Sequence, residues 1–232
     1  MLKANLTGPT LYPVIGNHHL AISDLENFDE IEPMINHTAY LWEDWLTEES
    51  KKQYLENGCY TQKLKLSSGK IVDKVNIVVY NSQPCYYLNF YSFVQRYDAG
   101  GILDWLNKTL AEFEVKGEIA IIASHIPAAT EECIQSWSIR YKAIVDRYQH
   151  IIRFSVYGHL HAEWHNLARS FKDDKPIGVS FWASSVTPYL DVNPSFRVFE
   201  VDEETMIPLK VHTYALFLNE SEPKWRHSHE MA

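Results

Sequence analysis

Ile119-Ala120-Ile121-Ile122-Ala123 runs directly into Ser124-His125-Ile126-Pro127, so a short apolar run ends in a small residue and a histidine. Residues 154–161 (Phe-Ser-Val-Tyr-Gly-His-Leu-His) and 11–19 (Leu-Tyr-Pro-Val-Ile-Gly-Asn-His-His) have the same arrangement. Each apolar run has the length and composition of a buried strand. In open α/β sheets, ligands bind beyond the carboxyl ends of the strands. The side chains that we expect in one such crevice are Asn17, His125, His159 and His161.

These residue types suit a metal. Neutral imidazole binds zinc, manganese or iron, and an asparagine carbonyl oxygen adds a hard donor without charge. On an extended segment, His159 and His161 would point to opposite sides, which suits two adjacent metals. A glycine before the ligand allows the backbone to approach closely. One histidine at a strand end is usually an ordinary hydrogen-bonded residue, but three such motifs together indicate a metal site. Four other histidines are expected to have only this ordinary role: His19, His37, His165 and His212.

The rest of the chain predicts a layered α/β fold. Apolar periodicity predicts helices over residues 41–57, 101–117 and 133–149. Strands are expected over residues 60–66, 71–80, 118–123, 151–157, 178–183, 196–201 and 208–218. Strands and helices alternate in the middle of the chain and strands dominate its end, which favours a mixed sheet or paired sheets. Residues 222–232 are polar and are expected to be a flexible tail, and such a tail makes His227 and His229 poor metal ligands.

Size and composition narrow the class of protein. A length of 232 residues with 46% apolar residues fits one domain. The net charge is −9 and Lys and Arg form no long run, so no nucleic-acid polymer is expected as a partner. No apolar run approaches the roughly 18 residues of a transmembrane helix, and the first residues lack a signal-peptide pattern. The 7 Trp and 14 Tyr leave open a lipid- or glycan-binding module, although most are expected in the core.

Cysteines and sequons leave the compartment open. Three cysteines permit one disulfide and one free thiol. Asn-X-Ser/Thr sequons are common by chance and favour secretion only mildly. The four sequons are at Asn5, Asn36, Asn107 and Asn219.

A family resemblance follows from the motifs. Gly16-Asn17-His18, the strand-end His125 and Gly158-His159-Leu160-His161 resemble the last three motifs of the calcineurin-like metallophosphoesterases. Further segments are similar to the acid sphingomyelinase branch of that superfamily, and the similarity covers residues 12–218. These segments are Asn89-Phe90-Tyr91, residues 98–106 (Asp-Ala-Gly-Gly-Ile-Leu-Asp-Trp-Leu), residues 124–127, residues 133–137 (Cys-Ile-Gln-Ser-Trp) and residues 193–198 (Asn-Pro-Ser-Phe-Arg-Val).

The resemblance implies a fold, an activity and roles for particular residues. The implied fold is a layered αββα sandwich, and the implied reaction is hydrolysis of sphingomyelin or a related phospholipid or nucleotide phosphodiester by two metals, usually zinc. Asn17, His125 and His159 would bind one metal and His161 the other. His18 would protonate the leaving-group oxygen as general acid.

The same resemblance pairs Cys85 with Cys133 in a disulfide. That bridge would imply an oxidising compartment, either secreted or the lysosomal and endomembrane lumen. Cys59 is then expected to be a buried free thiol.

The sequence also departs from the family pattern. It contains no Asp-X-His motif and no Gly-Asp pair, and only 15 residues precede Gly16. His161 would then be the one retained protein ligand of its metal. We therefore expect residues 1–221 to be the C-terminal part of the phosphoesterase domain, without its N-terminal portion. Two functions stay open: a phosphodiesterase, and a catalytically inactive family fragment or secreted binding domain.

Overall fold

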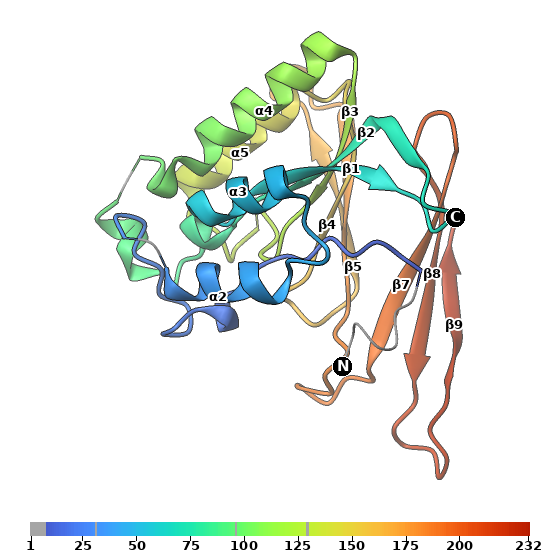
Figure 1. The fold of residues 1–232 in the computed structure, drawn as a ribbon. Coiled ribbons are helices and arrows are strands. Elements are labelled where there is room, and N and C mark those ends of the chain that lie inside the picture. Colours follow the sequence, from blue (N-terminus) through green and yellow to red (C-terminus); the bar gives the residue numbers. More distant parts are fainter. Residues whose placement is uncertain (1–7, 31, 96, 129) are drawn as a thin grey trace.

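A six-stranded mixed sheet forms the centre of the molecule (Figure 1). The computed structural model describes residues 8–30, 32–95, 97–128 and 130–232. In the central sheet β2, β3, β4 and β6 run parallel, and the edge strands β1 and β5 pair antiparallel with β2 and β6. In spatial order the strands are β1 (Tyr60–Lys65), β2 (Ile71–Val79), β3 (Ile119–Ala123), β4 (Ile152–Tyr157), β6 (Pro176–Trp182) and β5 (Trp164–Arg169).

Two helices cover one face of this sheet. They are α4 (Ile102–Lys116) and α5 (Gln135–Arg147). The apolar side of α4 is buried against the sheet, and the helix ends at Gly117, which has φ 63°. The Asp98 carboxylate accepts hydrogen bonds from the backbone N–H groups of Leu103 and Asp104, both at 2.9 Å, and so caps the first turn. The predicted helices over residues 101–117 and 133–149 are confirmed.

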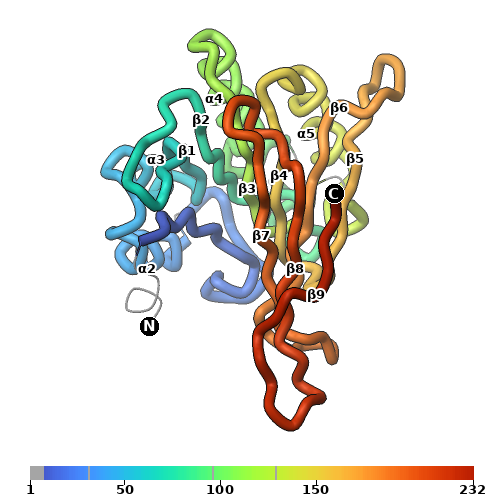
Figure 2. The backbone as a smooth tube through the Cα atoms, turned by 90° about the vertical axis from the view of Figure 1, so that its right-hand side faces the viewer, coloured from blue at the N-terminus to red at the C-terminus, as the bar shows by residue number. Residues whose placement is uncertain are grey.

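A second sheet and a helical pair cover the other face (Figure 2). The second sheet contains β7 (Ser195–Val201), β8 (Pro208–Leu216) and β9 (Trp225–Met231), all antiparallel. The helical pair is α2 (Pro33–Leu41) and α3 (Glu48–Asn57). Phe154 and Phe181 of the central sheet pack against Phe199 of β7, with ring centroids 5.7 and 5.2 Å away. The prediction of a layered α/β fold with paired sheets is therefore confirmed.

The expected single helix over residues 41–57 is wrong. The chain forms α2 and α3 with a turn between them, in which the N–H groups of Trp45 and Leu46 both bond to the carbonyl of Trp42. Thr47 then caps α3, because its hydroxyl accepts a hydrogen bond from the N–H of Ser50 at 3.1 Å. Aromatic residues at near-helical spacing concealed this break.

The expected strand over residues 11–15 is also wrong. The segment is extended but joins no sheet in the described residues. Side chains hold it in place: the Tyr60 hydroxyl donates to the carbonyl of Pro13 at 2.9 Å, and the Tyr12 hydroxyl donates to the carbonyl of Lys63 at 3.1 Å. Pro13 has no N–H for a ladder, which is the physical reason that an apolar run is not a strand here.

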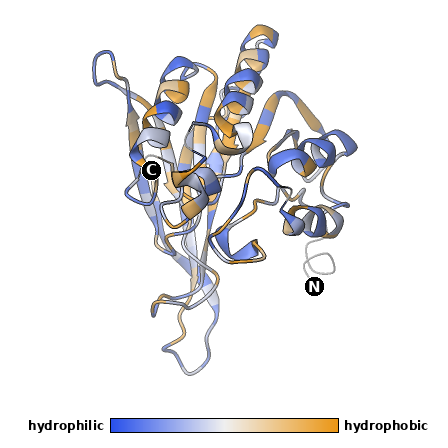
Figure 3. Cartoon of the chain, turned by 90° about the vertical axis from the view of Figure 1, so that its left-hand side faces the viewer, coloured by the Kyte–Doolittle hydropathy of each residue, from blue (hydrophilic) through white to orange (hydrophobic). Residues whose placement is uncertain are grey.

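The polar tail expected over residues 222–232 contains the strand β9, so its predicted flexibility is wrong for β9. Residues Leu216 and Val211 of β8 pair with Trp225 and Met231 of β9. Most β9 side chains are exposed, so the sequence lacks the apolar alternation that identifies a half-buried strand. Figure 3 shows apolar residues concentrated on the strands of the central sheet.

Four short 3-10 helices complete the described elements: η1 (Asn17–His19), η2 (Gln83–Cys85), η3 (Phe90–Phe93) and η4 (Ala99–Gly101). Each helix in the described ranges is too short or too polar to cross a bilayer. The sequon asparagines at 36, 107 and 219 are exposed, whereas the predicted sequon at Asn5 lies outside the described residues.

Candidate active site

Asn17 and His125 meet at the carboxyl end of β3. Asn17 lies in η1 and is 2% exposed. Its Oδ1 accepts a hydrogen bond from His125 Nε2 at 2.8 Å, across 108 residues of chain. The Asn17 amide nitrogen donates to Asp24 Oδ1 at 2.6 Å. Because a carboxylate only accepts, Asp24 determines which end of the amide faces His125.

Two glycines lie beside the His125 ring. A Cβ added to Gly16 would lie 3.1 Å from three atoms of the His125 ring. Gly158 donates its N–H to the carbonyl of His125 at 3.0 Å, and a Cβ on Gly158 would lie 3.4 Å from His125 Nδ1. A side chain at Gly16 would push the imidazole away, whereas a Cβ at Gly158 would be in ordinary contact with it, so the predicted role of glycine in close backbone approach holds at Gly16.

His159 completes the cluster, in which Asn17 is buried and both histidines are partly buried. Its ring lies edge-on to His125, with centroids 5.2 Å apart, and edge-on to Tyr86 at 5.0 Å. Its Nε2 lies 3.6 Å from Glu132 Oε2. The structure therefore brings Asn17, His125 and His159 together, as the motifs predict.

The predicted disulfide between Cys85 and Cys133 is present. It joins the two segments that hold His159, because Tyr86 follows one cysteine and Glu132 precedes the other. Backbone hydrogen bonds run alongside it, with the N–H of Ile134 donating to the carbonyl of Cys85 at 2.7 Å. Cys59 is the buried free thiol that the sequence predicts.

His161 lies near this cluster but in a different contact. Its ring faces Tyr189, with centroids 5.6 Å apart, and its buried Nδ1 has no hydrogen-bond partner among the described residues. His159 and His161 both have positive φ, 71° and 55°. The segment is therefore a folded turn, and the prediction of an extended His-X-His segment is wrong. The backbone bends directly after β4, where the N–H of Leu160 donates to the carbonyl of Gly158 at 2.9 Å, so the two rings do not alternate as they would on a strand.

Burial controls the charge of the cluster. Burial, with a smaller contribution from the neighbouring histidines His159, His19, His18 and His161, lowers the pKa of His125 to about 3. Burial also lowers the pKa of His159, although the Glu132 carboxylate opposes that shift. His125 is therefore neutral at ordinary pH, which is the form of imidazole that binds metals.

His18 and His19 leave the cluster in different directions. His18 is exposed, and its Nδ1 lies 3.4 Å from the Ser23 hydroxyl. His19 Nδ1 accepts the N–H of Gly16 at 3.1 Å, and its ring packs edge-on to Trp42. His19 therefore has the structural role expected for it, and His18 is the exposed imidazole that adjoins Asn17 in sequence.

Comparison with known proteins identifies the family. No family model matches the chain. Over 93% of its length it is 30% identical to sphingomyelin phosphodiesterase B of Dictyostelium discoideum. It is 29% identical to sphingomyelin phosphodiesterase of Homo sapiens over 97% of its length, and 24% identical to acid sphingomyelinase-like phosphodiesterase 3b of Mus musculus over 100%. This chain belongs to the acid sphingomyelinase-like phosphodiesterase family.

The chain matches only part of each relative. The match covers 35% of the Dictyostelium discoideum protein, 37% of the human protein and 54% of the mouse protein. Membership of the acid sphingomyelinase-like family confirms the resemblance that the motifs predict.

Sequence reasoning about this family member missed the residues that orient the cluster. These residues are Asp24, Tyr86, Glu132 and Tyr189. None lies in a strand-end motif, and each meets its histidine or asparagine through the fold. The one sequence signal for any of them is that Tyr86 and Glu132 are adjacent to Cys85 and Cys133, the pair that the family resemblance implies.

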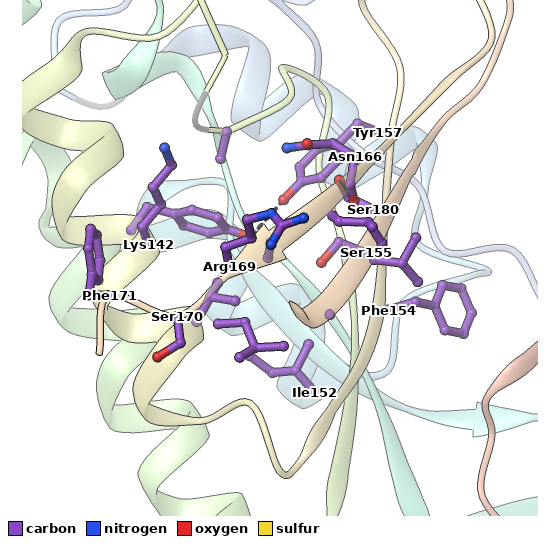
Figure 4. Close-up of a pocket in the computed structure, with 18 of the residues that line it drawn as sticks. Lys142, Ile152, Phe154, Ser155, Tyr157, Asn166, Arg169, Ser170, Phe171 and Ser180 are labelled. Carbon is purple, nitrogen blue, oxygen red and sulfur yellow. Dashed lines mark hydrogen bonds between the residues drawn. The ribbon is translucent and has the colours of Figure 1, made fainter. Parts of the chain in front are cut away.

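A cavity of about 490 Å³ lies elsewhere, between α5 and strands β4, β5 and β6 (Figure 4). None of the motif histidines lines it. Its guanidinium, Arg169, is already paired with Asp174, donating to the carbonyl at 2.7 Å. The same guanidinium lies 3.5 Å from the Asp174 carboxylate. The cavity is separate from the candidate active site of this family member.

Proposed function

We propose that this chain carries part of the active site of a metal-dependent phosphodiester hydrolase. Its substrates would be sphingomyelin or a related phospholipid or nucleotide phosphodiester. The observation that supports this most is the convergence of Asn17, His125 and His159 in one partly buried cluster. The relatives named above are sphingomyelin phosphodiesterases, which supports the same reaction class.

The donor atoms of the cluster suit zinc. Two ligands of one tetrahedral zinc ion lie about 3.3 Å apart, given bond lengths of about 2.0–2.1 Å. Asn17 Oδ1 and His125 Nε2 lie 2.8 Å apart. A small movement of the two side chains away from each other would let a zinc ion replace the proton that they share. We assign Asn17, His125 and His159 to one metal. The buried Nδ1 of His161, which lacks a partner in the described residues, is assigned to a second.

The surrounding residues would have separate tasks. When bound, the metals would polarise the phosphoryl group and activate water. Asp24 holds the Asn17 carbonyl toward His125. Glu132 and Tyr86 restrain the His159 ring from two sides. His18, the exposed neighbour of Asn17 in sequence, would donate a proton to the leaving-group oxygen.

One observation favours a second candidate function. The 232 residues contain no Asp-X-His motif and no Gly-Asp pair, so the second metal would have His161 alone from the family's motifs. A single imidazole does not hold zinc tightly, since structural and catalytic zinc sites use three or four protein ligands. On this view the chain by itself is a non-catalytic domain that binds one metal.

Zinc content and hydrolysis distinguish these functions. We would measure bound zinc by mass spectrometry and follow hydrolysis of bis(p-nitrophenyl) phosphate and of sphingomyelin vesicles. The wild type and His165→Ala, which changes an exposed histidine outside the cluster, are expected to hydrolyse substrate equally. His159→Ala is expected to lose both zinc and activity. Equal activity in His159→Ala and wild type would reject the proposed site, and zinc without hydrolysis would favour the non-catalytic domain.

The compartment is a further part of this proposal. The Cys85–Cys133 disulfide supports an oxidising environment, such as the secretory pathway or the lysosomal lumen. Asn219 is exposed in the turn between β8 and β9 and is an accessible glycosylation acceptor. The test expresses the chain in secreting cells and measures its mass before and after glycosidase treatment. A loss of mass on treatment that Asn219→Gln abolishes would support a glycan at this position, and protein without the modification would reject it.

A further inference from the structure

An irregularity in β9 gathers metal-binding side chains on the outer face of the second sheet. Tyr214 of β8 pairs with His227, and the preceding residue, Thr213, pairs with His229. Ser228 is therefore an extra residue, a bulge, in β9. Side chains normally alternate between the two faces of a sheet, but this bulge places His227 and His229 on opposite faces.

The two faces then have different chemistry. His229 points inward, where its Nε2 lies 3.0 Å from Glu163 Oε2. His212 pairs with Glu230, so these two side chains share a face. Tyr214 lies two residues after His212 in β8 and therefore points to the same face, as does its partner His227. Without the bulge, His227 and Glu230, three positions apart, would lie on opposite faces.

The three outward side chains approach one another closely. His212 Nδ1 lies 3.3 Å from His227 Nε2 and 3.5 Å from Glu230 Oε2. All three ligand atoms lie within 4.8 Å of one another, the one such group of His, Cys, Asp and Glu side chains in the described ranges. The Tyr214 ring packs edge-on to His227 at 5.3 Å and supports its orientation.

A fourth residue orients the central imidazole. Glu200 of β7 places its Oε1 2.6 Å from His212 Nε2. With Nε2 donating to this carboxylate, Nδ1 of the neutral ring presents a lone pair toward His227 and Glu230. A carboxylate behind a metal-binding histidine fixes its tautomer and makes it a better ligand.

We propose that His212, His227 and Glu230 form a surface site for zinc or a similar divalent cation. Separations of 3.3 and 3.5 Å match the roughly 3.3 Å between two ligands of one tetrahedral zinc ion. Three protein ligands leave one position open to water or to a carboxylate or phosphate oxygen. The ion would join β8 to the edge strand β9, and it needs none of the residues of the candidate active site.

The competing state contains no metal. A protonated His212 could instead lie between the carboxylates of Glu200 and Glu230, 2.6 and 3.5 Å away. That ion-pair arrangement uses the same atoms but does not need His227. Zinc uptake therefore separates the two states.

The test titrates zinc chloride into the full chain by calorimetry, with the absorption spectrum of bound Co²⁺ as a second readout. Wild type and the exposed control His165→Ala are expected to bind one more ion than His227→Ala. Glu200→Gln is expected to weaken binding by about 10- to 100-fold while keeping the stoichiometry. Repeating the comparison with and without His227→Ala in chains that also carry His159→Ala removes the contribution of zinc bound at the candidate active site.

Two results would overturn the site. One is equal stoichiometry and affinity in wild type and His227→Ala. The other is a Co²⁺ spectrum that His227→Ala leaves unchanged. Because His227 is exposed, its replacement by alanine is not expected to unfold the chain.

Discussion

Replacing Glu26 by glutamine is expected to remove a pH dependence from the stability of the chain. Glu26 is 2% exposed, and its carboxyl accepts hydrogen bonds from Asn81 Nδ2 at 3.0 Å to each oxygen. Burial raises the pKa of Glu26 to about 8, the Asn81 hydrogen bonds oppose this, and the charge of Glu32 adds to it. The Asn89 side chain holds the backbone of Glu26 in place, because its Oδ1 accepts the Glu26 N–H and its Nδ2 donates to the Glu26 carbonyl, both at 3.3 Å. The loop that it fixes also carries Asp24, which orients Asn17.

The sign follows from the direction of the shift. A carboxyl whose pKa is higher in the folded than in the unfolded state stabilises the fold below the unfolded pKa, and the contribution is lost as the pH rises through the folded pKa. With an ordinary value of 4.5 and a folded value of about 8, the loss occurs between pH 4.5 and 8. By pH 7 it amounts to about 3 kcal/mol, and above pH 9 to about 5 kcal/mol, at 1.36 kcal/mol per pKa unit.

Urea unfolding at a series of pH values from 4.5 to 8.5 measures this loss. The neutral amide of Glu26→Gln has no proton to lose, so the free energy of unfolding of the variant minus that of wild type should rise by about 3 kcal/mol between pH 4.5 and 7. All other titrating groups are common to both proteins and cancel in the difference. Glu30→Gln changes an exposed carboxyl and serves as the matched control.

Two outcomes would contradict a raised pKa of Glu26 in the folded chain. If the curves of free energy against pH are parallel for wild type and Glu26→Gln, the buried carboxyl does not bind its proton more tightly in the folded state. A Glu30→Gln variant with the same slope change as Glu26→Gln would also contradict the argument, because an exposed group cannot produce it by burial.

Three further changes test the packing around the cluster. Replacing Cys85 and Cys133 by alanine together should lower the free energy of unfolding by about 4 kcal/mol, since the bridge closes a loop of 48 residues, as urea unfolding under oxidising conditions would measure. Gly16→Ala should cost about 1–3 kcal/mol in the same assay, because its new Cβ would lie 3.1 Å from the His125 ring; an unchanged midpoint would contradict that contact. Tyr157→Phe removes a hydroxyl that bonds two other buried tyrosine hydroxyls, at 2.6 and 3.5 Å, and should lower the melting temperature, corresponding to about 1–3 kcal/mol.

Apolar periodicity in the sequence predicted most of the helices and strands, because such patterns depend on neighbouring residues in the chain. The apolar run at β3 and the spacing along α4 give the structure that these patterns favour. Periodicity failed at the break between α2 and α3, where Thr47 starts a new helix although the apolar spacing continues. It also failed at Pro13, which has no N–H to donate to a neighbouring strand. It also failed at β9, because a strand exposed on most of its length has no apolar alternation to detect.

The sequence by itself determined the chemistry available to this protein: the asparagine of the Gly-Asn-His motif, the strand-end histidines, the glycines beside them and the cysteine pair. These features depend on residue types and local patterns, and the family resemblance follows from them. Only the tertiary structure decided which atoms meet. Asn17 and His125 bond across 108 residues. Asp24 orients Asn17, and Glu132 contacts His159, both from loops without a motif. One extra residue in β9 likewise selects His227 over His229 as the neighbour of His212. Such contacts depend on strand register and loop packing between distant segments, and local propensities do not contain that information.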